Sequence, residues 1–274
     1  MRNLRGTAVL IGMLTAMLAG VQLITGVVAP QAVAAEKNCR VILHRAMYEG
    51  TENQPKGVTF AKPYGMVEAD ANPTEPTEED PDGVIVAAHD NGLDRLTGGD
   101  STSQIGNVTW EELRSFDHPF GKFRRTTSLI NRAAEINSPI MINLHRAGEW
   151  TPALIDELYA ASRNHPRPEV VYFGGAGTVE LMHERHEDAS TFHRFAGDAD
   201  PARMTTVIDR EGYELVALRG PHWVAEIVDD VRTTGVKVAT TQIDSGEDVR
   251  RAQAAGINII QGNRPRWIAE KVCA

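Results

Sequence analysis

Val41-Ile42-Leu43-His44-Arg45 shows the pattern that decides the fold of this chain, a short apolar run that ends in polar residues. Several such runs lack strict alternation of apolar and polar residues and are rich in Val and Ile, which is typical of strands buried on both faces. We expect strands over Arg40–His44, Gly65–Asp70, Gly83–His89, Pro139–His145, Glu169–Gly174, Met204–Asp209, Val236–Ile243 and Ile257–Gln261.

Amphipathic stretches lie between these runs. Trp110–Phe116 begins with a capping box of Thr109 and Glu112. Further helices are expected over Thr151–Arg163, Val179–Glu187, Pro221–Thr234 and Glu247–Ala255, the last with Ser245 as its cap. Roughly eight strands alternating with helices predict an α/β fold, a single (β/α)₈ TIM barrel. A doubly wound open sheet is the alternative, but no G-x-G-x-x-G motif follows the first strand.

The composition excludes several classes of protein. The 274 residues are 42% hydrophobic and 24% charged, as in a soluble globular protein with a buried core. The formal net charge of −9 does not suit nucleic-acid binding, for which a basic face is expected. A small anionic ligand remains compatible, because a local cation outweighs a diffuse negative field.

The first 35 residues resemble a targeting segment. Arg2 and Arg5 precede an uncharged run over residues 6–30 and a small-residue exit, Ala32-Val33-Ala34-Ala35. This order predicts a secretory signal peptide cleaved after Ala34 or Ala35. The alternative is a retained membrane anchor, because the run is long enough to cross a bilayer. Cleavage would leave a secreted single domain over residues 36–274 with no stable membrane span.

Two cysteines lie near the ends of that domain. Cys39 precedes the first expected strand, and Cys273 is the penultimate residue. In an exported protein, two cysteines favour one disulfide that ties the ends together, and two unpaired thiols are the alternative.

Polar side chains that can carry chemistry follow the expected strands, where the active sites of (β/α)₈ barrels lie. Glu68 and Asp70 are two apart on a strand and therefore share a face. Their mutual repulsion favours a hard divalent ion such as Ca²⁺ or Mg²⁺ between them. His44 and His89 end strands on either side, and imidazoles can act as acid and base at neutral pH. Arg45 offers a fork of donors for phosphate oxygens.

These residues resemble the motifs of glycerophosphodiester phosphodiesterases. Val41–Arg45 followed by Glu52-Asn53 is similar to their H-R-G…E-N-T opening, and Glu68-Ala69-Asp70 to their E-x-D metal pair. The run from His89 to Thr97 resembles H-D-x-x-L-x-R-T-T, and Gly256–Pro265 a late G-V-D-G-I-I-T-D-R-P strand.

The resemblance implies a metal-dependent hydrolase that cleaves small glycerophosphodiesters, such as deacylated phospholipids, to glycerol 3-phosphate and an alcohol. His44 and His89 would be the acid/base pair, and Glu68 and Asp70 metal ligands. Arg45 would contact phosphate, and Glu52 would support the site from the loop after the first strand.

The sequence also departs from the family pattern. Ala46 replaces the glycine of H-R-G, Gln54 the threonine of E-N-T, and Gly262-Asn263 the usual T-D. In the strand expected over residues 139–145, Asn143 and His145 occupy the positions of E-x-K, where the family has a third metal ligand and a phosphate contact. Asn143 would then offer the metal an uncharged oxygen, and His145 would contact the substrate.

Two other functions remain open at this point. A phospholipase or sphingomyelinase D-like enzyme shares the barrel, the two histidines and the metal pair, but acts on intact lipids. A non-catalytic barrel that binds a ligand is the third hypothesis, which the changes at Asn143 and His145 motivate.

Overall fold

The structure, a computed structural model, describes residues 40–145, 150–164, 170–174, 176–195 and 197–272. The predicted signal peptide over residues 1–35 lies outside the described residues. So do Cys39 and Cys273, and the predicted disulfide between them therefore stays a prediction.

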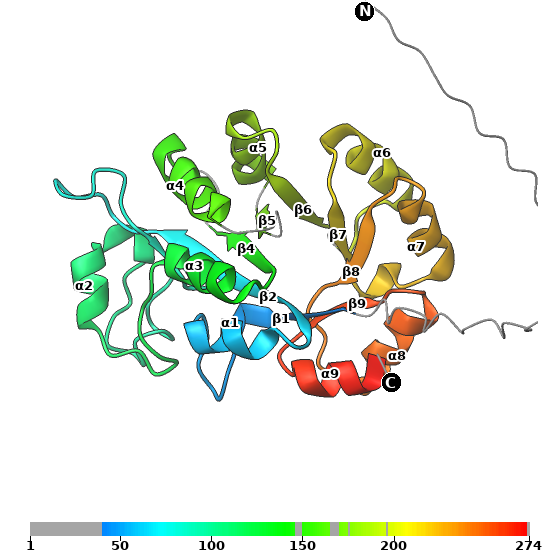
Figure 1. The fold of residues 1–274 in the computed structure, drawn as a ribbon, viewed down its shortest axis with the longest axis horizontal. Coiled ribbons are helices and arrows are strands. Elements are labelled where there is room, and N and C mark those ends of the chain that lie inside the picture. The colour runs from blue at the N-terminus through cyan, green and yellow to red at the C-terminus, as the bar shows by residue number, and fades with distance from the viewer. Residues whose placement is uncertain (1–39, 146–149, 165–169, 175, 196, 273–274) are drawn as a thin grey trace, which may run out of the picture. The chain divides into compact units, whose positions relative to one another are not determined.

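Eight parallel strands form a closed barrel, so the predicted α/β fold and (β/α)₈ architecture are confirmed (Figure 1). The order around the barrel is β1-β9-β8-β7-β6-β5-β4-β2, and pairing of β1 with β2 closes the ring. The strands are β1 (Arg40–Leu43), β2 (Gly65–Pro73), β4 (Ile140–Leu144), β5 (Val170–Gly174), β6 (Ser190–Arg194), β7 (Leu215–Leu218), β8 (Lys237–Thr240) and β9 (Ile259–Gly262).

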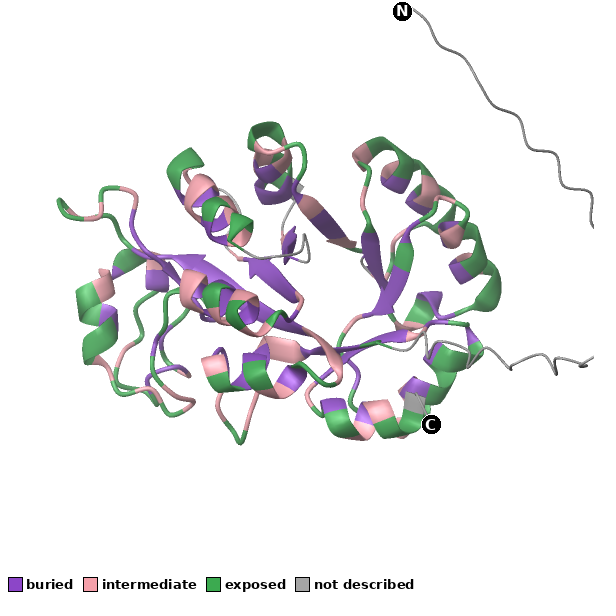
Figure 2. Cartoon of the chain, in the orientation of Figure 1, coloured by how far each residue is buried: buried purple, intermediate pink, exposed green. Residues whose placement is uncertain are grey.

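Helices surround these strands and turn their buried faces toward them (Figures 1 and 2). They are α1 (Pro55–Ala61), α2 (Trp110–Ser115), α3 (Thr126–Ile136), α4 (Pro152–Arg163), α5 (Ala176–Arg185), α6 (Pro201–Glu211), α7 (Ala225–Arg232), α8 (Gly246–Ala254) and α9 (Pro265–Val272), with short 3₁₀ turns η1 (His44–Ala46), η2 (Ile105–Asn107) and η3 (Gly220–His222). The capping box of Thr109 and Glu112 and the cap at Ser245 are both present. In the described part of the chain, no helix has the length and apolar character needed to cross a bilayer.

The alternation of side chains along each strand separates two apolar layers. Ile42, Met141, Phe192 and Ala217 belong to the cluster that fills the barrel. Residues of the opposite parity, such as Leu43, pack outward against the helices. The residue two positions after each interior residue therefore also faces inward, but at the carboxyl-terminal mouth of the barrel.

Two parts of the strand prediction are wrong. Met204–Asp209 lies in helix α6, which Asp200 caps and Gly212 ends in a left-handed conformation. The strands there are β6 and β7, whose sequences on either side of α6 were not recognised as strands. The run over Gly83–His89 forms only β3 (Ile85–Val86), which pairs antiparallel with the end of β2 and is not a barrel strand.

A long insertion follows β2 and carries β3, η2 and α2 before the chain returns at α3. It has an apolar core of its own that includes Val86, Leu93 and Leu96. Asn72, near the end of β2, donates from its amide nitrogen to the Ala88 carbonyl at 2.8 Å. This bond fixes the chain next to His89, so the insertion brings that histidine to the barrel.

Helix α1 supports the first turn of the mouth by a close approach. A Cβ atom on Gly57 would lie 1.7 Å from the carbonyl oxygen of Ala46, which ends η1. Only a residue without a side chain allows this contact between helix and turn.

We therefore expect Gly57→Ala to lower the free energy of unfolding by more than about 2 kcal/mol, because buried backbone must move to admit one methyl group. Chemical denaturation measures the loss. Gly177→Ala is the matched control, since nothing lies within 4 Å of its added Cβ and alanine favours the helix α5. Equal stabilities of the two variants would contradict the close packing of α1 on η1.

Candidate active site

A cavity of about 500 Å³ opens at the carboxyl-terminal mouth of the barrel. Its lining includes five of the residues singled out in the sequence, namely His44, Arg45, Glu68, His89 and Asn143. Asp70 is hydrogen-bonded to Asn143 of this group, and His145 is hydrogen-bonded to Asp70. The structure thus brings together the polar residues that were expected at the ends of separate strands.

Glu68 and Asp70 lie on β2 with their side chains fully buried, both 0% exposed. One Glu68 carboxylate oxygen, Oε2, accepts the Arg45 backbone N–H at 2.5 Å. Its other oxygen, Oε1, is buried and has no hydrogen-bond partner among the described residues. An orphaned carboxylate oxygen next to a second acid is a natural position for a proton or a cation.

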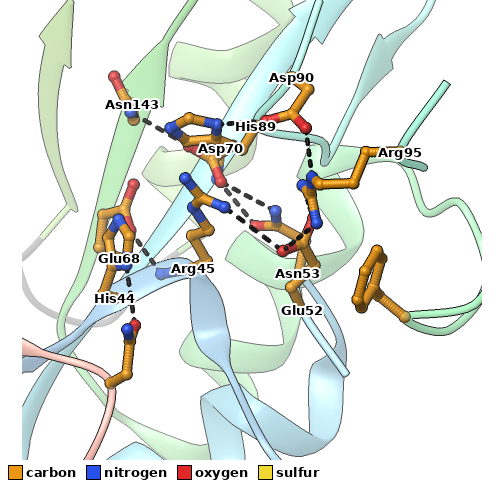
Figure 3. Close-up of polar contacts among 12 residues, drawn as sticks. His44, Arg45, Glu52, Asn53, Glu68, Asp70, His89, Asp90, Arg95 and Asn143 are labelled. Carbon is orange, nitrogen blue, oxygen red and sulfur yellow. Dashed lines mark hydrogen bonds and ion pairs between the residues drawn. The ribbon is translucent and has the colours of Figure 1, made fainter. Parts of the chain in front are cut away.

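Asp70, in contrast, has hydrogen-bond donors at both carboxylate oxygens, two of which, Asn53 and Asn143, are drawn in Figure 3. Its Oδ1 faces the Asn143 amide nitrogen at 3.1 Å and the His145 Nε2 at 2.7 Å. Its Oδ2 accepts from the Asn53 amide nitrogen at 2.9 Å, and its backbone N–H donates to Asn53 at 3.0 Å. Register supports this arrangement, because Asp70 and Asn143 are paired across β2 and β4.

The two carboxyls therefore titrate in opposite directions. Burial, and then repulsion from Asp70, raise the pKa of Glu68 well above its usual range. Burial alone would also raise the pKa of Asp70, but the hydrogen bond and charge of His145, with further help from His89 and Asn53, lower it below its usual range. As the pH falls, Glu68 therefore takes up a proton before Asp70 does.

His44 directly follows β1 and reaches the cavity from η1. Its Nδ1 lies 2.9 Å from the Asn263 side-chain oxygen, which can only accept, so Nδ1 carries the proton and Nε2 is left with a lone pair. Burial lowers the pKa of His44, with a smaller contribution from Arg45 in the same direction. A neutral imidazole with a free nitrogen suits a general base.

His89 comes from the insertion rather than from the end of a barrel strand, which corrects the sequence-based placement. Its ring centre lies 6.4 Å from that of His44. Its Nδ1 is 2.7 Å from Asp90 Oδ1, and Arg95 contacts the other oxygen of Asp90. Because Asp90 accepts the Nδ1 proton, His89 presents Nε2 to the site in a fixed orientation.

Glu52 anchors this group to the loop after β1 (Figure 3). Its carboxylate accepts from the Arg95 guanidinium at 2.7 and 3.3 Å and lies 3.6 Å from the Arg45 Nη1. Glu52 is thus a buried bridge between the arginine next to His44 and the arginine behind His89.

Arg45 owes its position to a left-handed turn. Arg45 and Ala46 have φ values of 54° and 44°, in the region that glycine occupies without steric cost. The glycine that the family pattern has at Ala46 therefore answers a backbone requirement that alanine meets here with some strain. The Arg45 carbonyl accepts the Asn53 backbone N–H at 2.6 Å, which closes the turn.

His145 packs beside His89, with ring centres 4.8 Å apart. Its backbone is held by the Ala71 carbonyl at 2.9 Å and by the Trp150 indole, which donates to the His145 carbonyl at 2.6 Å. Asp70, His89 and His145 each offer a ligand atom, and these atoms lie within 4.8 Å of one another. Among the described residues, this is the group of three His, Cys, Asp or Glu side chains whose ligand atoms lie close enough to hold one metal ion.

Asn143 meets Asp70 through its amide nitrogen, so oxygen ligation of a metal by Asn143 requires the amide to turn over. Two donor sets that share Asp70 are thus present, the predicted one with Glu68 and Asn143 and a second with His89 and His145.

Comparison with known proteins identifies the family. The sequence profile of the glycerophosphoryl diester phosphodiesterase family matches residues 61–260. The chain belongs to that family. As a member, it is a phosphoric diester hydrolase. No curated protein sequence matches the chain.

Solved structures of similar proteins share the fold of this phosphodiesterase. An Oleispira antarctica phosphodiesterase in complex with the product sn-glycerol-3-phosphate has a TM-score of 0.73 at 16% identity, over 86% of this chain and 97% of that one. A glycerophosphodiester phosphodiesterase from Agrobacterium tumefaciens has a TM-score of 0.67 at 16% identity, over 85% and 99%. One from Thermotoga maritima has a TM-score of 0.65 at 15% identity, over 85% and 97%.

The sequence analysis did not assign a role to several residues of this site. Asn53 and Arg95 lie within the motifs already quoted, so their positions beside assigned residues were the available signal. Arg194 and Arg219 also line the cavity. They lie at the ends of β6 and β7, the two strands that the sequence analysis missed.

The buried Glu68 gives a test of the charge distribution. In chelator at pH 7, we expect Glu68→Gln to raise the melting temperature, by about 2–4 °C for each kcal/mol recovered. A carboxyl whose pKa is raised in the folded state lowers the free energy of unfolding as the pH rises toward and through that pKa. Glutamine does not ionise and therefore avoids this loss. The difference should shrink as the pH is lowered toward the ordinary pKa of glutamate. A variant less stable than wild type across this range would contradict the assignment.

Proposed function

We propose that this enzyme hydrolyses small glycerophosphodiesters, such as deacylated phospholipids, to glycerol 3-phosphate and an alcohol. The observation that carries the proposal is the pair of imidazoles, His44 and His89, that line one cavity with a buried carboxylate pair. The Oleispira phosphodiesterase, whose fold is similar, is in complex with sn-glycerol-3-phosphate, which supports a substrate of this size.

The hydrogen bonds of the two histidines give them different roles. His44, neutral and with Nε2 free, takes a proton from the attacking water as the water oxygen bonds to phosphorus. As the bond from phosphorus to the leaving alcohol breaks, His89 gives the alcohol oxygen a proton from Nε2, while Asp90 holds Nδ1. Arg45 binds non-bridging oxygens, and Glu52 orients its guanidinium.

A divalent cation, Ca²⁺ or Mg²⁺, is part of the proposal. Its ligands are Glu68, through the orphaned Oε1, and Asp70, with Asn143 after its amide turns over. When bound, the cation supplies positive charge to the non-bridging phosphate oxygens. Asp70, His89 and His145 form the competing donor set, and two imidazole nitrogens would favour a transition metal such as Zn²⁺.

The melting temperatures of wild type and Glu68→Gln, measured with metal in place of the chelator, distinguish the two sets of metal ligands. With millimolar Ca²⁺ or Mg²⁺, wild type should gain melting temperature and Glu68→Gln should not. A gain with Zn²⁺ alone that survives in Glu68→Gln would instead place the metal on Asp70, His89 and His145.

Replacement of the histidines tests the catalytic roles. His44→Ala and His89→Ala should each lower kcat by about 10²–10⁴, the usual contribution of a positioned acid or base, with little change in melting temperature. Release of choline or ethanolamine from glycerophosphodiesters measures the rate. The control is His186→Ala, which removes a histidine that pairs with Asp156 outside the cavity.

Three outcomes would redirect the proposal. Faster release from the diacyl lipids than from their deacylated forms would favour a phospholipase or sphingomyelinase D-like activity. Wild-type rates in both histidine variants would exclude the catalytic assignment, and absence of any turnover by wild type would favour a non-catalytic, ligand-binding barrel.

Secretion is also part of the proposal, supported by the order of charged, apolar and small residues over positions 1–35. The exported chain would begin at Ala35 or Glu36 and contain a Cys39–Cys273 disulfide. Amino-terminal sequencing of protein from the medium should find one of these starts, and titration of the denatured, unreduced protein should find no free thiol. An intact leader or two titratable thiols would contradict these assignments.

A further inference from the structure

Arg194 and Arg219 face the cavity from the side opposite the carboxylates. Arg194 ends β6 and is in register with Ala217 of β7, and Arg219 follows Ala217 by two positions. Ala217 belongs to the apolar cluster inside the barrel, as does Phe192 two positions before Arg194. Alternation along the two strands therefore turns both arginines inward at the mouth, and both line the cavity.

Within the described part of the chain, neither the Arg194 nor the Arg219 guanidinium forms an ion pair or a hydrogen bond. Two acids line the same cavity, Glu68 and Asp248. Glu68 accepts the Arg45 backbone N–H, and Asp248 contacts Ser245 and Arg251. Desolvation, and then repulsion from Arg219, lower the pKa of Arg194, with an opposing contribution from Glu68.

The loop that presents Arg219 is fixed from several sides. The Arg219 carbonyl accepts the His222 backbone N–H at 2.9 Å. The Trp223 indole donates to the Leu218 carbonyl at 2.9 Å, and Arg251 donates to the Gly220 carbonyl at 3.1 Å. Two positively charged side chains are thus held on one rim of the cavity, where both are exposed and an anion can reach them.

The order of the strands places Arg194 and Arg219 on the side of the barrel opposite the strands that lead to the proposed catalytic residues. In the ring of eight strands, β6 is four positions from β1 and β7 is four positions from β2. Arg194 therefore ends the strand opposite β1, which leads to His44, and Arg219 follows the strand opposite β2, which carries Glu68 and Asp70. A phosphate between His44 and His89 leaves the arginine side of the cavity for another part of the substrate.

We infer that Arg194 and Arg219 form a subsite for a second anionic group, a phosphate or a carboxylate, on the alcohol part of the substrate. The inference rests on the proposed function and makes it more specific. The preferred substrates are glycerophosphodiesters whose alcohol carries its own negative charge. Guanidinium groups suit this role, because they bind either anion through paired, charge-assisted hydrogen bonds.

Turnover of matched diesters tests the preference. For wild type, we expect kcat/KM to be about tenfold or more higher for glycerophosphoserine, or for glycerophosphoglycerol with a terminal phosphate, than for glycerophosphoglycerol itself. The carboxylate and phosphate substrates show which anion the subsite prefers. In Arg194→Met and Arg219→Met the ratio should fall toward one. Arg203→Met is the control for the lost charge, since Arg203 on α6 is 86% exposed and does not line the cavity.

Calorimetry gives a readout that does not depend on turnover, with propyl phosphate and propane-1,3-diol bisphosphate as probes. Wild type and Arg203→Met should bind the bisphosphate about tenfold or more tightly than the monophosphate, and the two subsite variants should lose this difference. Equal binding of both probes by wild type would overturn the inference. So would an equal loss of both probes in the variants, because the arginines would then contact the reacting phosphate. A retained bisphosphate preference without any turnover would support the subsite and refute the proposed function.

Discussion

Two buried carboxylates two residues apart on β2 are the constraint around which the mouth of this barrel is arranged. Like charges cannot both be kept in such a place without compensation, and the structure treats them unequally. Asp70 receives donors from Asn53, Asn143 and His145, whereas Glu68 keeps one oxygen without a partner. Three surrounding elements each contribute a donor to one of the two acids: η1 the Arg45 N–H, β4 Asn143, and the loop after η1 Asn53.

The closed barrel and the first half of the site could be predicted from the sequence. Strands β1, β2 and β4 have short apolar runs followed by polar residues. This pattern predicts that the polar side chains meet at one mouth of the barrel. His44 directly follows β1 and Asn143 lies near the end of β4, as expected, whereas Glu68 and Asp70 lie within β2, which continues to Pro73. The different hydrogen bonding of Glu68 and Asp70 could not be predicted from the sequence, because it depends on which donors the folded chain brings to each carboxylate oxygen.

The errors have physical causes as well. Strand β6 reads Ser-Thr-Phe-His-Arg, with too few apolar residues for a buried strand, because its inward end is part of the charged mouth. Met204–Asp209 has the hydrophobicity of a strand, but Met204 and Ile208 are four apart and lie on one buried face of a helix. His89 was expected on a barrel strand because apolar residues precede it. Those residues serve the core of the insertion, and only long-range contacts reveal it.

The two histidines that line the cavity belong to different parts of the chain. His44 is continuous with the barrel, whereas His89 and Arg95 belong to the insertion, which has its own apolar cluster. Contacts such as Asn72 with Ala88 and Glu52 with Arg95 join the two. Segments with separate cores can open independently of the global unfolding reaction. A local opening of the insertion would withdraw His89 and its support while the eight strands stay paired, and activity would then be lost without unfolding of the barrel.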